Sequence, residues 1–196
     1  MDKASLSKMR LQKMCAQLYT IGEPCPELFT YIKVHALDLP TIQALTGIMA
    51  VCLCRFDGDG ERPSSFTFAE DGVASVVIEV LGADGATVID LVAWPLHAPD
   101  CFALAIGEAD MLGIWNMISR GGLPLPVHHT PHDWLVAGCQ GCVPLNMQWA
   151  GHWLDKAGGP FVSQDLEHGR EVRDLLGAAA AKHSILVQLS DERRVA

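Results

Sequence analysis

The stretch ASVVIEVLGADGATVIDLVAW, residues 74–94, decides the expected fold. Apolar runs rich in β-branched residues lie on both sides of Asp84-Gly85, and an Asp-Gly pair between two such runs favours a β-hairpin. The two runs before this stretch are also strand-like, and further Asp-Gly turns separate the runs from one another. The sequence therefore predicts a central antiparallel meander over about residues 48–94.

The other segments have the spacing of helices and of short strands. Apolar side chains in residues 4–20 recur at helical spacing, and prolines near the starts of two later segments are compatible with helix N-termini. The expected helices are 4–20, 27–37, 41–47, 99–114, 131–138, 146–157 and 164–181. The expected short strands are 124–128, 141–145, 160–162 and 184–189. The expected fold class is α+β: N-terminal and C-terminal helices cover the meander, and short extra strands lie in the C-terminal half.

A chain of 196 residues with 49% hydrophobic content suits one domain with one substantial core. Within a single domain 1–196, we expect a helical N-terminal segment at 1–47, a mixed α/β body at 48–189 and a tail at 190–196. No run reaches the roughly 18 apolar residues that a membrane span needs, and the first residues do not resemble a signal peptide. We therefore expect a soluble, cytoplasmic protein with no membrane partner.

Cysteine content and charge narrow the class of protein. The seven cysteines are odd in number and scattered, which is typical of reduced thiols that pack as small apolar side chains. A formal net charge of −9, with no Lys/Arg cluster beyond Arg193-Arg194, argues against a protein that binds a phosphate backbone. Nucleic-acid binding is therefore not expected. An acidic surface suits a protein partner, self-association or imitation of nucleic acid.

Glu79 and Asp90 are the candidate catalytic residues. A hairpin with Asp84-Gly85 at its tip places them directly opposite each other on one face. Like charges so placed repel, and the pair persists if a cation lies between them, if one acid is protonated, or if the face is wet. The functional interpretation is a divalent-metal site or an acid/base pair. The alternatives are a register shifted by one residue, or neutralisation by an Arg or Lys of a covering helix.

The segment from His128 to Cys142 holds the densest set of metal-capable side chains. His128, His132, Cys139 and Cys142 offer four nitrogen or sulfur ligands, the number in a tetrahedral zinc site. Their spacing is not that of a common zinc finger, and the cysteines follow a helix end, where the helix dipole disfavours thiolate. The alternative to a zinc site is that this segment is structural: a helix ends before Cys139, and a turn then leads into a short buried strand that begins at Cys142. We expect no cofactor by default, with zinc or another divalent metal as the candidate.

The C-terminal helices carry the other candidates. Trp149 and Trp153, at i and i+4, lie on a helix that is apolar nearly all round. Such pairs are more often part of a core, but a partly exposed pair would anchor a protein partner. His168, in the last long helix, is expected to point to solvent.

Four segments carry a resemblance: residues 77–81 (VIEVL), 87–96 (TVIDLVAWPL), 130–139 (TPHDWLVAGC) and 167–171 (EHGRE). They are similar to segments of uncharacterised bacterial proteins associated with prophages or mobile elements. The resemblance spans about residues 65–176 and includes no diagnostic catalytic motif. It implies a mobile-element context, but it implies no activity and assigns no site residue.

These observations lead to three hypotheses for function. The first is a soluble accessory protein of mobile-element type that acts by binding a protein partner. The second is a metal-dependent hydrolase or nuclease that uses the paired carboxylates Glu79 and Asp90. The third is an acidic inhibitor that mimics nucleic acid, for which carboxylates should cluster on one surface. Whether the protein is an enzyme stays open at this point.

Overall fold

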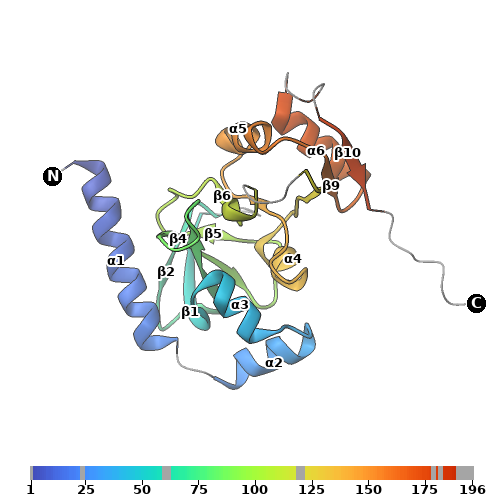
Figure 1. Cartoon of the computed structure of the whole chain (residues 1–196). Coiled ribbons are helices and arrows are strands. Elements are labelled where there is room, and N and C mark those ends of the chain that lie inside the picture. Colours follow the sequence, from blue (N-terminus) through green and yellow to red (C-terminus); the bar gives the residue numbers. More distant parts are fainter. Residues whose placement is uncertain are drawn as a thin grey trace, which may run out of the picture.

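A five-stranded antiparallel sheet forms the centre of the molecule (Figure 1). The computed structural model describes residues 2–22, 25–58, 63–117, 122–177, 180 and 183–188, so the predicted tail at 190–196 lies outside the described residues. The strands are β1 (Met49–Asp57), β2 (Ser65–Phe68), β3 (Val73–Leu81), β4 (Val88–Pro95) and β5 (Ala103–Leu104). Their order across the sheet is β2-β1-β3-β4-β5.

Helices cover both faces of this sheet, because its strands carry apolar side chains on both sides. The covering helices are α1 (Lys3–Ile21), α2 (Pro26–Val34), α3 (Leu39–Thr46) and α4 (Pro131–Val136). α1 lies on one face, where Leu11, Met14 and Leu18 are buried against strand residues such as Leu91. α2, α3 and α4 contribute to the core on the opposite face, around the fully buried Trp94.

The C-terminal half forms a second, smaller layer with its own core. α6 (Leu166–Leu176) packs on α5 (Met147–Ala157) and against a three-stranded parallel sheet of order β10-β9-β7 (Figure 1). The strands of this sheet are β7 (Leu125–Pro126), β9 (Phe161–Ser163) and β10 (Ile185–Val187). The remaining elements are two short paired strands, β6 (Met111–Leu112) and β8 (Val143–Pro144), and the short helix η1 (Ile114–Met117).

The predicted α+β class is confirmed, with three differences in arrangement. β1 lies between β2 and β3, so the strands do not follow simple meander order. Residues 99–114, predicted as a helix, contain β5 and β6, because Gly107 and Gly113 adopt φ values of 73° and 71° that interrupt a right-handed helix. α5 and α6 lie with the small sheet instead of the central one. Among the described residues, no helix has both the length and the apolar character needed to cross a bilayer.

Candidate metal centre

The β3–β4 hairpin does not place Glu79 opposite Asp90, so the predicted catalytic pairing is wrong. Near the turn the register is the predicted one, but a β-bulge at Ile89 then shifts it by one residue. Beyond the bulge, Glu79 pairs with Leu91 and Asp90 pairs with Val80. Because side chains alternate between the two faces of a strand, the bulge turns Asp90 onto the face opposite to Glu79.

Glu79 is a buried structural carboxylate. Its Oε2 accepts the backbone N–H of Ile48 at 3.1 Å, and its Oε1 accepts the hydroxyl of Tyr19 at 3.4 Å. A Cβ at Gly47 would collide with the same carboxylate, and Gly47 has a φ of 70°, so this close approach needs glycine. The carboxylate therefore joins the end of α1 to the connection between α3 and β1.

Asp90 holds a loop against β4. Its two oxygens accept four backbone N–H groups, from Leu91 (2.8 Å), Ile106 (3.1 Å), Glu108 (2.8 Å) and Ala109 (3.3 Å). Burial raises the pKa of Asp90, and the N–H groups act in the opposite direction. With both oxygens bound to backbone, the carboxylate is committed to the fold and is not offered to a metal.

The side chains of His128, His132, Cys139 and Cys142 form no group of three or more converging ligand atoms within the described residues, so this predicted zinc set is wrong, although the backbone N–H of His128 donates to the carbonyl of Cys142 at 2.9 Å. Cys139 has a left-handed backbone (φ 60°) after α4 and packs in the core with Trp94, whereas Cys142 packs in the C-terminal core. Burial raises the pKa of Cys139 to about 12, which keeps it a neutral thiol, while thiolate is the form that binds metal. Across the described ranges, metal-capable side chains converge in one group, which contains none of these four.

Both histidines of the predicted set are bound to protein groups. His132 Nδ1 lies 2.5 Å from the hydroxyl of Tyr31, which also accepts the indole N–H of Trp94 at 3.3 Å. His128 Nε2 lies 2.9 Å from the carbonyl oxygen of Gln140, and since a carbonyl only accepts, this nitrogen carries a proton. Burial lowers the pKa of both imidazoles. These contacts account for both side chains as parts of the fold.

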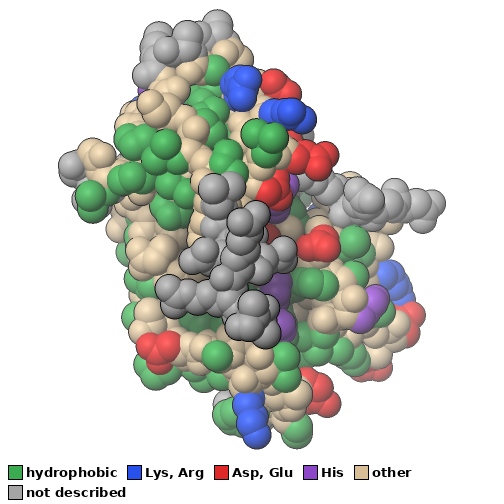
Figure 2. Space-filling view, turned by 90° about the vertical axis from the view of Figure 1, so that its right-hand side faces the viewer, with side chains coloured by type: hydrophobic (Ala, Val, Ile, Leu, Met, Phe, Trp, Pro, Cys, Tyr) green, Lys and Arg blue, Asp and Glu red, His purple; other side chains and the backbone are tan. Residues whose placement is uncertain are grey.

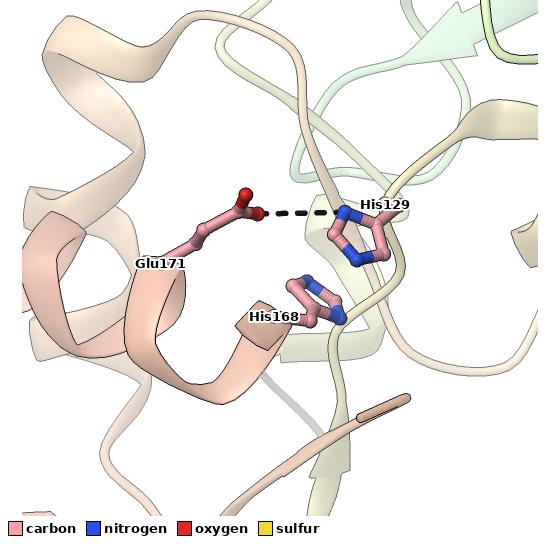
Figure 3. Close-up of side chains that lie close together, drawn as sticks. All are labelled: His129, His168 and Glu171. Atoms are coloured by element: carbon pink, nitrogen blue, oxygen red, sulfur yellow. Dashed lines mark ion pairs between the residues drawn. The ribbon is translucent and has the colours of Figure 1, made fainter. Parts of the chain in front are cut away.

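The group that does form consists of His129, His168 and Glu171 (Figure 3). One candidate ligand atom from each residue lies within 4.8 Å of the other two. His129 Nδ1 is 3.4 Å from Glu171 Oε2, and the two imidazole rings stack with centroids 3.8 Å apart. Figure 3 shows His129 on a connecting segment, facing two side chains that both come from α6. Two imidazoles and a carboxylate, from two segments that are distant in the sequence, thus lie close together.

Local sequence explains how these side chains are positioned. Asp165 is the N-cap of α6 and accepts the backbone N–H of His168 at 2.8 Å, which places His168 in the first turn. Glu171 follows three residues later and therefore shares a helix face with His168. The backbone N–H of His129 donates to the side-chain oxygen of Gln164 at 2.9 Å, which fixes the distant segment beside the start of α6.

His168 is neutral at physiological pH. Burial and the neighbouring His129 lower its pKa to about 4, against a smaller opposing effect of Asp165. Its Nδ1 accepts the backbone N–H of Gln164 at 3.3 Å, so the neutral ring carries its proton on Nε2. Since metals bind neutral imidazole, protons compete little with a metal for this ring.

The cluster opens onto a cleft of about 450 Å³. Figure 2 shows histidine side chains in a hollow in the middle of one face, with acidic side chains beside it. Pro144, Met147 and Leu175 form an apolar part of the cleft, and Asp174 adds a second carboxylate to that of Glu171. The volume is within the range of small-molecule sites, so a ligand could reach a metal held by the cluster.

Sequence reasoning missed this cluster. His168 was predicted to point to solvent, and that prediction is wrong because its side chain is buried. The spacing of His168 and Glu171, three residues apart in a helix, is the one signal that a pair of ligands shares a face. His129 lies in the segment that contains the predicted zinc ligands, but its position in the sequence does not indicate that it lies beside α6.

The two tryptophans predicted to bind a partner differ in exposure. Trp149 is 51% exposed on α5. Trp153 is partly buried: its indole N–H donates to Asp110 Oδ2 at 2.9 Å, and the Lys156 ammonium lies 5.2 Å from its ring centroid. The fold therefore holds Trp153 in place, and Trp149 is the member of the pair that is presented to solvent.

No family model, curated protein or solved structure matches this chain. The resemblance of its segments to prophage-associated proteins therefore stays a prediction. A function for the cluster is supported by its geometry and its chemistry alone.

Proposed function

We propose that this chain is a metal-binding protein in which His129, His168 and Glu171 hold zinc or a similar divalent transition metal. The observation that carries the proposal is the convergence of their ligand atoms within 4.8 Å beside an open cleft. Two histidines and a glutamate are a ligand set of catalytic zinc sites, and bonds of about 2.0–2.2 Å set neighbouring ligand atoms roughly 3.4 Å apart. His129 and Glu171 are already 3.4 Å apart. No separation in the group exceeds 4.8 Å, so each would have to close by at most roughly 1.4 Å. Because an imidazole binds a metal in the plane of its ring, one of the two stacked rings would also have to rotate.

Binding at His168 has an identifiable cost. If a metal takes Nε2, the ring proton moves to Nδ1, which then faces the backbone N–H of Gln164 instead of accepting from it. Losing that hydrogen bond costs about 1–3 kcal/mol. Zinc binding to structural sites releases roughly 10–16 kcal/mol, so the cost lowers the affinity without preventing binding.

Three protein ligands leave the fourth position of a tetrahedral metal open, as in catalytic sites. A metal held in this way supplies Lewis acidity at that open position. A divalent metal would offset the two negative charges of Glu171 and Asp174, so charge alone does not select between a neutral and an anionic ligand in the cleft. The cluster supports metal-dependent hydrolysis as its chemistry, whereas a hydrolase or nuclease that uses Glu79 and Asp90 loses its support, because these two carboxylates lie on opposite faces of the sheet.

Calorimetric titration of the metal-free protein with zinc tests the proposal. We expect one zinc per chain, and an affinity loss of about 100-fold or more in Glu171→Gln and in His129→Ala, because each removes a ligand. Matched controls are Glu167→Gln, an exposed acid on the same helix, and His152→Ala, an exposed histidine on α5. Unchanged affinity in both ligand variants, with native circular dichroism, would contradict the proposal.

A protein partner is the second candidate function, as expected of an accessory protein. The observation that favours it is the exposure of two large apolar side chains on α5: Trp149 is 51% exposed and Met147 is 40% exposed. Exposed Trp is a frequent anchor of protein interfaces. Sedimentation of the wild type and Trp149→Ala over a range of concentrations tests self-association through this helix. Association that Trp149→Ala leaves unchanged would remove α5 as the interface.

A further inference from the structure

α1 is a basic helix on an acidic protein. Together with its N-cap Asp2, it carries four cationic residues and one carboxylate, while the whole chain has a formal net charge of −9. Since α1 and its cap sum to +3, the rest of the chain carries −12. The cationic residues are Lys3, Lys8, Arg10 and Lys13. Arg10 and Lys13 line the same groove beside the helix, whereas Lys8 lines a different cleft.

Lys8, Arg10 and Lys13 are exposed and take part in no ion pair within the described residues. The ion pairs of that part of the chain are Arg55–Asp71, His129–Glu171 and His183–Asp155. Lys8 lines a cleft with the acids Glu108 and Asp110, but in the part of the chain that the structure describes no ion pair neutralises Arg10 or Lys13. Uncompensated cations on one helix create a local positive potential that attracts an acidic partner.

A groove of about 540 Å³ runs beside the N-terminal half of α1. Arg10 and Lys13 line it together with the apolar side chains of Leu6, Met9 and Ile106. Leu6 is 49% exposed and Met9 is 52% exposed. The groove thus combines two cations with three apolar side chains.

The exposure of this half of α1 is not a consequence of a loose helix. Leu11, Met14 and Leu18 are buried against the central sheet, and Asp2 accepts the backbone N–H of Ser5 at 2.8 Å to cap the helix start. Figure 1 shows α1 as one continuous helix along the side of the molecule. Leu6, five residues before Leu11, is therefore held in place by a helix that is capped before it and anchored after it.

We propose that this groove docks an acidic segment of a partner protein that inserts an apolar side chain between Leu6 and Met9. Carboxylates of the segment would pair with Arg10 and Lys13, which form no ion pair with any acid among the described residues. The concave shape favours an inserted side chain over a planar bilayer surface, and the apolar lining favours a peptide over a phosphate backbone. This surface is separate from the metal centre and does not depend on it.

Fluorescence anisotropy with the metal-free full chain tests the docking surface. The probe is a labelled helical peptide with Glu and Leu on one face, and the control peptides replace Leu by Ser or Glu by Gln. We expect the Glu/Leu peptide to bind in a salt-dependent manner, and Lys13→Glu or Leu6→Ser to weaken binding about tenfold. Lys33→Glu, an exposed charge reversal on α2 that does not line the groove, is the matched control and should bind as the wild type does.

Three results would overturn the proposal. The first is no binding of the Glu/Leu peptide, or binding that Lys13→Glu and Lys33→Glu weaken equally. The second is preferential binding to anionic lipid vesicles or to a DNA duplex that Lys13→Glu abolishes, which would assign the surface to a membrane or to nucleic acid. The third is concentration-dependent self-association that Lys13→Glu abolishes, which would make a second copy the occupant.

Discussion

His129 and His168 stack face to face, with ring centroids 3.8 Å apart and ring planes inclined by 25°. A proton on one ring places a positive charge beside the other, so the two rings do not readily become charged together. Burial, with a smaller effect of the neighbouring His129, lowers the pKa of His168 to about 4, so this ring stays neutral at physiological pH. Burial and the stack together thus keep His168 in the neutral form that binds metal.

Acidification should destabilise the metal-free protein through His168. The imidazole of His168 gains a proton near pH 6.5 in the unfolded chain but only near pH 4 in the folded chain. The stability that the neutral ring contributes is therefore complete above pH 6.5 and is lost as the pH falls towards 4. The loss should be on the order of 3 kcal/mol. Urea unfolding between about pH 7 and about pH 4 should show a smaller fall for His168→Gln than for the wild type. Equal falls would contradict the assignment.

Asp90→Asn should destabilise the fold and leave metal binding intact. An amide keeps one acceptor oxygen, so its NH2 group would face two of the four backbone N–H groups that Asp90 accepts. We expect a loss of about 2–4 kcal/mol in the free energy of unfolding. Glu108→Gln is the control, because Glu108 contributes only its backbone N–H to this contact. Lost zinc affinity in folded Asp90→Asn would restore the carboxylate as a metal ligand.

His132→Ala separates the structural histidine from the proposed ligands. The variant leaves the Tyr31 hydroxyl without its imidazole partner, which should cost about 1–3 kcal/mol of stability. Tyr31→Phe removes the same contact, so the double variant should be less destabilised than the sum of the single variants. Zinc affinity should equal that of the wild type. A loss of about tenfold or more would return His132 to the metal site.

Local signals in the sequence were sufficient for the α+β class and for most element positions. Asp84-Gly85 does form the tip of a hairpin, and Gly82 N–H bonds to Thr87 O at 2.8 Å beside it. The bulge at Ile89 was not predictable in the same way. It turns Asp90 toward the backbone of residues 106–109, and that contact exists only in the folded chain.

The cluster of His129, His168 and Glu171 could not be predicted from the sequence for a related reason. The helical spacing of α6 indicates which residues share a face, but not whether that face meets solvent or another segment. His168 is buried because α6 packs closely on β9, where a Cβ at Gly169 would lie 3.0 Å from Ser163 Oγ. His129 arrives from the segment before α4. Only the tertiary arrangement joins the two histidines.

Anomalous diffraction from zinc-soaked crystals is the most direct test of the proposed metal centre. We predict one peak in the cleft, bonded at about 2.0–2.2 Å to a nitrogen of His129, a nitrogen of His168 and an oxygen of Glu171. The peak should be lost in Glu171→Gln crystals soaked in the same way. Zinc bound instead at His132 or at the cysteines, or no peak at the cluster in well-ordered soaked crystals, would contradict the proposal.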